Sequence, residues 1–138
     1  MKPPEEVQRG LVQQWIAKAA QDMDAAVFLL TQGDRFRGAI GFHSQQAAEK
    51  YLKALLEELG LSVEKTHELE DLLDQLLPHH LSLRSLRRGL AFLSQFAVEV
   101  RYPGDNASKR QATSALRWAG KVRHACRGLL SLRGGKSP

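Results

Sequence analysis

Cysteine, proline and long apolar runs are scarce in this chain. Cys126 is the only cysteine among 138 residues, so an intramolecular disulfide is excluded. A chain without disulfides is compatible with a reducing compartment such as the cytosol. The ten residues from Gly89 to Val98 carry no charge, but a bilayer span needs about 20 apolar residues. The N-terminal segment lacks the apolar run of a signal peptide. We therefore expect a soluble, cytoplasmic protein with no membrane association.

Motifs of several enzyme classes are also missing. The sequence has no glycine-rich phosphate loop and no Gly-x-Ser-x-Gly turn. His67-Glu68 begins like the zinc motif of metalloproteases, but that motif needs a histidine at the position of Asp71. His79 and His80 are neighbours in an expected loop, with no cysteine or carboxylate at ligand spacing. The sequence thus predicts no metal and no cofactor.

The residues that are present favour one helical domain. With 43% apolar and 25% charged residues, the chain can bury a core and is not disordered by composition. No segment alternates with period two, so no strand is expected, whereas apolar residues recur at helical spacing. The expected fold is all-α, an up-and-down bundle of four long helices plus a short fifth helix. The helices are expected at 11–31, 35–59, 67–77, 81–100 and 108–132, within a domain of residues 11–132 between flexible ends at 1–10 and 133–138.

Local signals mark the ends of these helices. Gly33 stops the first helix, and Gly60 is suited to the residue after the end of the second. Thr66 is suited to the N-cap of the third, and Ser108 with Gln111 forms a capping box at the start of the last.

Other small residues indicate packing. Gly38 and Gly41 lie near the start of the second helix, where glycine costs helix propensity, and they predict close contact with another helix. Cys126 falls on the apolar side of the last helix and is expected to be a small core residue.

A polar stripe on the second helix is the first candidate site. His43, Gln46, Lys50 and Lys53 follow one another at three- and four-residue spacing, so they share one face. One interpretation is a solvated face, with Glu49 and Lys53 paired one turn apart. The other is a polar groove that holds a phosphate or an RNA backbone. Gln45 falls instead on the apolar side, where a buried amide needs structural hydrogen-bond partners.

A second candidate is a basic patch on the last helix. Its members lie within an arc of about 120° that contains no acidic residue, and mutual repulsion would favour an acidic partner. The patch could bind RNA or an acidic protein, or it could be a solvated face. Trp118 at its edge is the only aromatic side chain nearby, so base stacking is not indicated. The basic patch consists of Arg110, Arg117, Lys121, His124 and Arg127.

Four short segments together resemble the HEPN domain, whose name stands for higher eukaryotes and prokaryotes nucleotide-binding. They are residues 42–50 (FHSQQAAEK) followed by 52–55 (LKAL), Gly60, 66–69 (THEL) and 101–103 (RYP). The resemblance covers roughly residues 10 to 131 and implies a HEPN-like helical bundle that binds phosphate. The residues that would hold the phosphate or nucleotide are His43, Gln46, Lys50, Lys53, Arg101 and Tyr102.

Many HEPN proteins are metal-independent ribonucleases that carry an arginine followed, after four to six residues, by a histidine. Placing Arg101 on that motif puts the histidine position at Asn106, Ala107 or Ser108, and none of these is His. The resemblance therefore implies the fold and phosphate binding, but it does not carry over the nuclease activity. His43 could replace the missing histidine if it faced the same groove. Arg101 could also simply compensate the dipole at the end of a helix.

The first functional hypothesis is a nucleotide- or RNA-binding module without its own catalysis. Small HEPN proteins of this kind resemble the partners of minimal nucleotidyltransferases, often as toxin–antitoxin pairs, and the resemblance also implies a homodimer. The residues Leu90, Phe92, Leu93, Phe96 and Val98, spread around the expected fourth helix, agree with a dimer. The alternatives are a ribonuclease that uses Arg101 and His43, and a purely structural dimeric scaffold.

Overall fold

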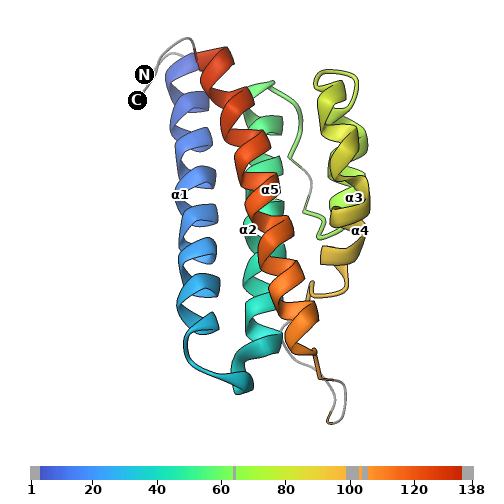
Figure 1. The fold of residues 1–138 in the computed structure, drawn as a ribbon. Coiled ribbons are helices and arrows are strands. Elements are labelled where there is room, and N and C mark those ends of the chain that lie inside the picture. The colour runs from blue at the N-terminus through green and yellow to red at the C-terminus, as the bar shows by residue number, and fades with distance from the viewer. Residues whose placement is uncertain (1–3, 64, 99–102, 104–105, 135–138) are drawn as a thin grey trace.

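The protein is a bundle in which three long helices lie side by side and two short ones form an added layer (Figure 1). The computed structural model describes residues 4–63, 65–98, 103 and 106–134, and these contain no strand. The predicted all-α bundle is therefore confirmed. The long helices are α1 (Pro4–Leu30), α2 (Arg37–Glu58) and α5 (Lys109–Gly134), and the short ones are α3 (Leu69–Leu76) and α4 (Arg87–Ser94). Two 3-10 segments, η1 (Asp34–Phe36) and η2 (Leu81–Leu86), precede α2 and α4.

Helix α2 is the centre of the bundle. It packs most extensively against α1 and α5, and it also contacts α3 and α4. Thirteen of its 22 residues are buried, including Tyr51, Leu52 and Leu55 at its middle. A helix that is covered from several sides has no continuous solvent-exposed face, so its buried polar residues need hydrogen-bond or ion-pair partners inside the protein.

Helix α1 begins two turns earlier than the sequence predicted. Residues 4–10, expected to be flexible, form its first turns, and α5 likewise continues to Gly134. The side-chain amide of Gln8 donates to the backbone carbonyls of Glu57 and Glu58, at 2.8 and 3.0 Å. These carbonyls lie at the C-terminal end of α2, where regular helical partners run out. The contact anchors the start of α1 to the end of α2.

The fourth helix is much shorter than the predicted 81–100. The segment starts as η2, where Leu83 and Leu86 face the core at three-residue spacing, and α4 ends at Ser94. The side chain of Gln95 donates to the carbonyl of Phe92 at 2.9 Å, and the amide of Phe96 bonds to Leu93 at 3.0 Å. Because these bonds replace the regular i to i−4 pattern, the helix tightens and stops. Only three of the expected four long helices are therefore long.

The short α4 also removes the sequence argument for a dimer. Leu90, Leu93 and Phe96 are fully buried inside this chain, and Phe92 packs partly against the same core. Of the residues predicted to surround the fourth helix, Val98 remains well exposed, at 64%. The apolar residues of this segment are thus needed for the fold of one chain.

Most predicted helix ends are confirmed. Gly33 and Gly60 have φ angles of +92° and +73°, which favour glycine, and the amide of Leu61 reaches back to Leu56 at 3.0 Å. Ser108 and Gln111 exchange the two hydrogen bonds of a capping box, at 2.8 and 3.0 Å.

Thr66 is the exception among the caps. Its hydroxyl accepts a hydrogen bond from the amide of Glu68, 3.1 Å away, and α3 begins only at Leu69. A local turn therefore uses this side chain before the helix starts, and Glu68 occupies the N-cap position without a side-chain bond. Cys126 is fully buried as predicted, and burial raises the pKa of its thiol.

Two glycines allow close approach of an aromatic ring. A Cβ on Gly41 would lie 2.3 Å from the Phe96 ring, and one on Gly89 would lie 2.0 Å from Trp118. The prediction of close packing is confirmed for Gly41. It is wrong for Gly38, because no atom lies within 4 Å of a Cβ placed there.

Among the described residues, none of the helices combines the length and the apolar composition that a bilayer crossing requires.

We predict that Gly41→Ala lowers the free energy of unfolding by about 1–3 kcal/mol, because the added methyl group collides with the buried Phe96 ring. Urea unfolding followed by circular dichroism measures the change. Gly38→Ala on the same helix is the matched control, and it should leave stability unchanged or raise it by up to about 1 kcal/mol. Equal stability of the two variants would contradict the close contact.

Candidate functional site

The polar stripe of α2 turns inward toward α1. Asp22, on the buried side of α1, contacts two of its members. Its Oδ1 lies 2.8 Å from Nδ1 of His43, and Lys50 Nζ donates to its Oδ2 at 2.5 Å. The other buried residues near Asp22 on α1 are apolar, so a lone carboxylate among them needs cationic partners. The Asp22 cluster (Asp22, His43, Lys50) therefore links α1 to α2 through charge.

The Asp22 cluster sets the orientation of the His43 ring. When His43 is neutral with its proton on Nδ1, it donates to the carboxylate, and Nε2 keeps its lone pair. The side chain of His43 is 26% exposed, and its ring meets Phe42 edge-on with 5.4 Å between centroids. A histidine held in this way by a carboxylate can accept a proton at Nε2.

A second cluster forms around Glu49, which lies next to Lys50 in α2. Lys53 Nζ donates to its Oε2 at 2.8 Å, and His67 Nδ1 lies 2.9 Å from its Oε1. Gln45 donates to Oε1 at 3.2 Å and to the backbone carbonyl of His67 at 3.3 Å. Gln46 completes the network by donating to the side-chain oxygen of Gln45 at 2.8 Å. The Glu49 cluster (Gln45, Gln46, Glu49, Lys53, His67) ties the segment before α3 to α2.

Burial and hydrogen bonding act in opposite directions on Glu49. Burial alone raises the pKa of a carboxyl group, but the hydrogen bonds from Lys53 and His67 outweigh it and hold the pKa of Glu49 below its ordinary value. Glu49 is therefore ionised at neutral pH and forms a buried ion pair with Lys53. As predicted, Gln45 is a buried structural amide.

The two clusters separate the predicted phosphate ligands. His43 and Lys50 share Asp22, while Gln46 and Lys53 belong to the Glu49 network. Lys53 is only 5% exposed and its ammonium group lies 5.6 Å from the centre of the Trp15 ring. The solvated-face interpretation does not describe Lys53, and each of the two lysines already has a carboxylate partner. The spacing along α2 indicated Glu49 as a surface partner of Lys53 and did not indicate Asp22 or His67.

Two predicted phosphate ligands, Arg101 and Tyr102, lie outside the described residues. The positions where the ribonuclease motif would have its histidine are partly described. Ala107 is buried against the core, and Ser108 caps α5. Asn106 is exposed. Two of the three positions thus have structural roles that agree with the absence of a catalytic side chain.

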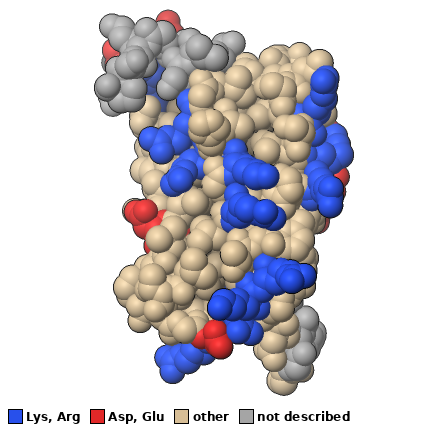
Figure 2. All heavy atoms as spheres, viewed as in Figure 1, with Lys and Arg blue, Asp and Glu red and all other residues tan. Residues whose placement is uncertain are grey.

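The basic patch of α5 is exposed as the sequence predicted. Figure 2 shows Lys and Arg side chains spread over the side of the molecule where α5 lies. All five members of the patch are exposed, and no described carboxylate forms an ion pair with them. Arg87 of α4, in contrast, bonds to Glu70 and Asp74 of α3 at 3.3 and 2.5 Å.

The charge of α5 exceeds that of the whole chain. The helix contains seven of the 20 Lys and Arg residues and none of the 15 Asp and Glu residues. The formal net charge is +5, so the remainder of the chain carries −2. An all-basic helix surface of this kind attracts anions and repels cations.

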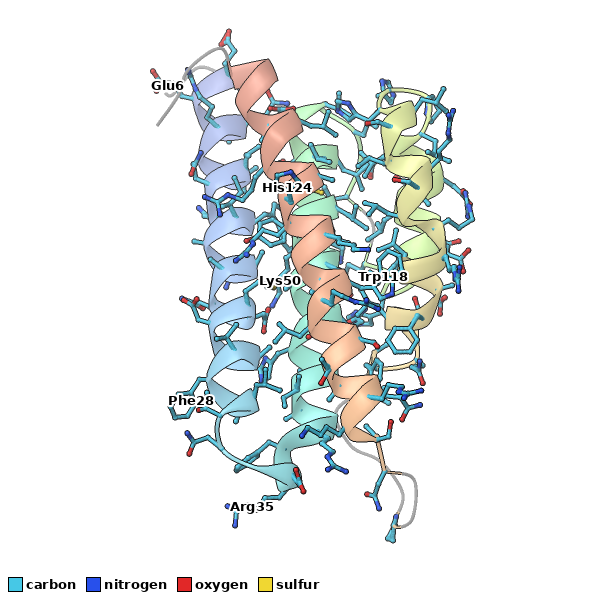
Figure 3. The ribbon with its side chains drawn as sticks, viewed as in Figure 1. Glu6, Phe28, Arg35, Lys50, Trp118 and His124 are labelled. Carbon is cyan, nitrogen blue, oxygen red and sulfur yellow. The ribbon has the colours of Figure 1, made fainter. Side chains whose placement is uncertain are left out.

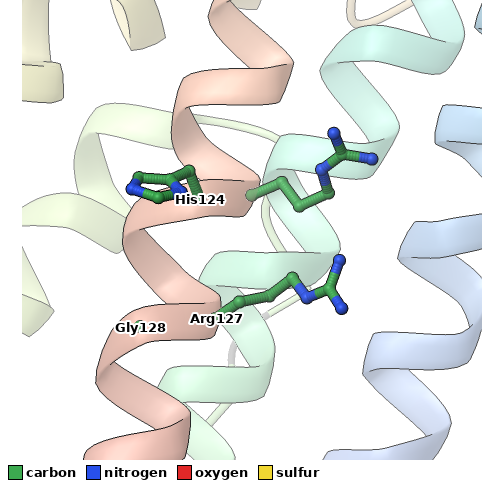
Figure 4. A pocket seen from close by; sticks show the side chains of 4 residues that line it. His124, Arg127 and Gly128 are labelled. Carbon is green, nitrogen blue, oxygen red and sulfur yellow. The ribbon is translucent and has the colours of Figure 1, made fainter.

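A shallow hollow of about 330 Å³ lies within the patch (Figure 4). It is lined by Arg123, His124, Arg127 and Gly128, and Figure 4 shows His124 and Arg127 extending in different directions from the helix. Arg123 was not among the residues predicted for the patch, although its position one turn before Arg127 could have indicated it. Figure 3 places His124 on α5 and Lys50 deeper in the bundle, so the two candidate regions do not coincide.

Comparisons with known proteins agree with this architecture. The model of the HEPN domain family matches residues 12–129. The chain is similar to the crystal structure of TT1696 from Thermus thermophilus, with 26% identity and a TM-score of 0.71, over 85% of this chain and 96% of that one. It is also similar to a HEPN domain protein (tm0613) from Thermotoga maritima, with 26% identity and a TM-score of 0.70, over 86% and 98%. No curated protein matches the chain.

We predict that Asp22→Asn lowers the free energy of unfolding by about 1–3 kcal/mol, because Lys50 loses its counter-charge in a largely buried site. Urea unfolding at pH 7 measures the loss. The matched control is Asp34→Asn, which removes the partner of Arg37 from a pair whose carboxylate is 79% exposed, and it should change stability little. Equal effects would mean that the Asp22 cluster does not hold α1 to α2.

Proposed function

The chain belongs to the HEPN domain family, and we propose that it is a cytoplasmic nucleotide- or RNA-binding module without catalysis of its own. The basic patch of α5 is the observation that supports this proposal. Its cations are exposed and have no carboxylate partner among the described residues, so an anionic ligand would relieve their mutual repulsion.

The electrostatics favour α5 over the stripe of α2 as the binding surface. Lys50 and Lys53 already contact Asp22 and Glu49 at hydrogen-bonding distance. A ligand there would have to compete with these carboxylates, and breaking either ion pair would cost free energy. A phosphate that approaches Arg117 or Lys121 displaces only water and counterions, and counterion release favours binding.

We further propose two partners. One is a separate minimal nucleotidyltransferase, with which the chain would form a toxin–antitoxin-like pair, as the family resemblance implies. The other is a second copy of this chain in a homodimer. Support for the dimer comes from the family and from Val27 and Phe28, two exposed apolar side chains near the end of α1 (Figure 3).

A metal-independent ribonuclease is the second candidate function, and the Asp22–His43 contact favours it. The carboxylate orients the imidazole so that Nε2 can act as a proton acceptor, the role of the missing motif histidine. Arg101 would then supply the positive charge for the phosphate.

We predict that the double variant Arg117→Ala/Lys121→Ala binds RNA about tenfold more weakly than wild type in low salt, because two phosphate-binding cations are removed. Fluorescence anisotropy with a labelled RNA measures the affinity. Lys18→Ala/Arg84→Ala is the control, since it removes two exposed cations from α1 and η2 and changes the net charge equally. Equal weakening in both variants would show that only net charge matters, and absence of binding by wild type would favour a structural scaffold.

We predict that the wild-type protein does not cleave RNA, with or without EDTA, because no histidine occupies the motif position. Gel analysis of a mixed RNA substrate checks this. If wild type cleaves in EDTA while His43→Ala and Arg101→Ala do not, the ribonuclease function replaces the binding module. His79→Ala, which changes an exposed histidine between α3 and η2, is the control for nonspecific effects of losing an imidazole.

A further inference from the structure

The basic patch extends along much of α5. Arg110 and Arg127 mark its ends, and the 17 residue steps between them correspond to about 25 Å of helix. This length exceeds the reach of one nucleotide phosphate group. In double-stranded DNA each strand places a phosphate about every 3.4 Å along the axis, so a duplex of comparable phosphate density would present several phosphates to such a surface. The geometry suits a polymer with a phosphodiester backbone.

The patch offers no surface on which bases could stack. Trp118 is the only Trp, Tyr or Phe in α5, and its ring packs against Gly89 of α4. Lys121 lies over the same ring, with its Nζ 4.6 Å from the ring centre. Proteins that hold single strands usually provide exposed aromatic rings for stacking. Contacts from this surface would therefore go to the backbone of paired nucleic acid.

Two glycines leave the helix backbone bare within the patch. A Cβ on Gly120 or on Gly128 would meet no atom of the chain within 4 Å, and neither residue has the positive φ that favours glycine. Glycine in a helix interior costs stability relative to alanine, so packing inside this chain does not explain either residue. Gly120 lies between Arg117 and Lys121 in the sequence, and Gly128 directly follows Arg127 and lines the hollow of the patch.

The charges of α5 also work against its own stability. Lys109 and Arg110 lie in the first turn, where the helix dipole favours acidic side chains, and the first turn contains none. Lys121 contacts the Trp118 ring, but the patch cations have no carboxylate partner among the described residues, and the two glycines weaken the helix. A ligand that is anionic and approaches closely would account for both features.

From these observations we propose that the outer face of α5 docks onto the phosphate backbone of base-paired RNA, independently of sequence. Gly120 and Gly128 let the sugar–phosphate ridge come close to the helix, while Arg117, Lys121 and Arg127 neutralise phosphates. This inference rests on the proposed function and specifies its ligand. RNA stems are recognised in general through their shape and backbone, and exposed cations without base-stacking rings suit contacts to a backbone.

The test compares wild type with Gly120→Leu and Gly128→Leu, which add bulk to the patch and keep its charge. Both variants should unfold at the same temperature as wild type or higher, because leucine favours helices and the space is open. We expect each to bind a hairpin RNA about fivefold or more weakly than wild type, measured by fluorescence anisotropy. Gly38→Ala, an open glycine on α2, should bind like wild type.

Comparing the binding of several ligands tests this inference separately from the proposed function. We expect hairpin RNAs of unrelated stem sequence to bind equally, and more tightly than unpaired RNA, duplex DNA or ATP. The double variant Arg117→Ala/Lys121→Ala should reduce the salt dependence, because the slope of log K against log salt becomes shallower by about 0.7–0.9 for each phosphate that is no longer neutralised.

Preferred binding of unpaired RNA or ATP, or equal binding of duplex DNA, would overturn the assignment to paired RNA. Unchanged affinity in both leucine variants would overturn the α5 docking surface, and both results leave RNA or nucleotide binding itself in place. Failure of wild type to bind any of these ligands would instead overturn the proposed function as well.

Discussion

The carboxylate of Asp22 lies where α1 meets α2, and the arrangement of the bundle centre depends on its two side-chain partners, Lys50 and His43. An unpaired carboxylate is costly to bury, so α1 packs on α2 in the register that brings His43 and Lys50 to it. That register fixes which face of α2 turns toward α1. Gln45 and Glu49 are then buried near the segment before α3, where they meet His67. Two charge clusters thus define how the central helix is seated.

The same seating divides the cations of the protein into two groups. Those of α2 have carboxylate partners and contribute to the fold. Those of the α5 patch lie outside, and no described acidic residue pairs with them. Among the helical glycines, Gly41 and Gly89 admit aromatic rings, while Gly120 and Gly128, like Gly38 of α2, face open space. Exposed cations without a carboxylate partner among the described residues and two open glycines thus occur together on α5.

How far the sequence predicted this structure depends on whether a feature is local. Helix ends at Gly33 and Gly60 and the capping box at Ser108 are decided by nearby residues, and they were predicted correctly. The basic patch was also predicted, because helical spacing alone places its members on one face. The length of α4 was not predicted correctly. Its apolar pattern continues beyond Ser94, but the hydrogen bonds around Gln95 end the helix there.

The candidate site on α2 shows more clearly what the sequence cannot predict, namely which helices pack against one another. Spacing placed His43, Lys50 and Lys53 on one face, but it could not show that this face turns toward Asp22 and Glu49. Partners that lie 21 or 28 residues away are set by tertiary packing. Asp22, a carboxylate among small and apolar residues of α1, was the signal in the sequence that indicated a buried charge pair. Its partners could be identified only by knowing which helix packs against α1.

The unequal charge of α5 and the remaining chain gives the molecule an electric dipole moment that points across the bundle toward α5. With +7 formal charges on one helix and −2 on the remainder, the protein would turn in the field of a polyanion before contact. In encounters with a polyanion, the protein would then present α5 to it more often than random orientation would give. Dissolved salt shortens the range of this alignment to about one Debye length, near 8 Å at physiological ionic strength.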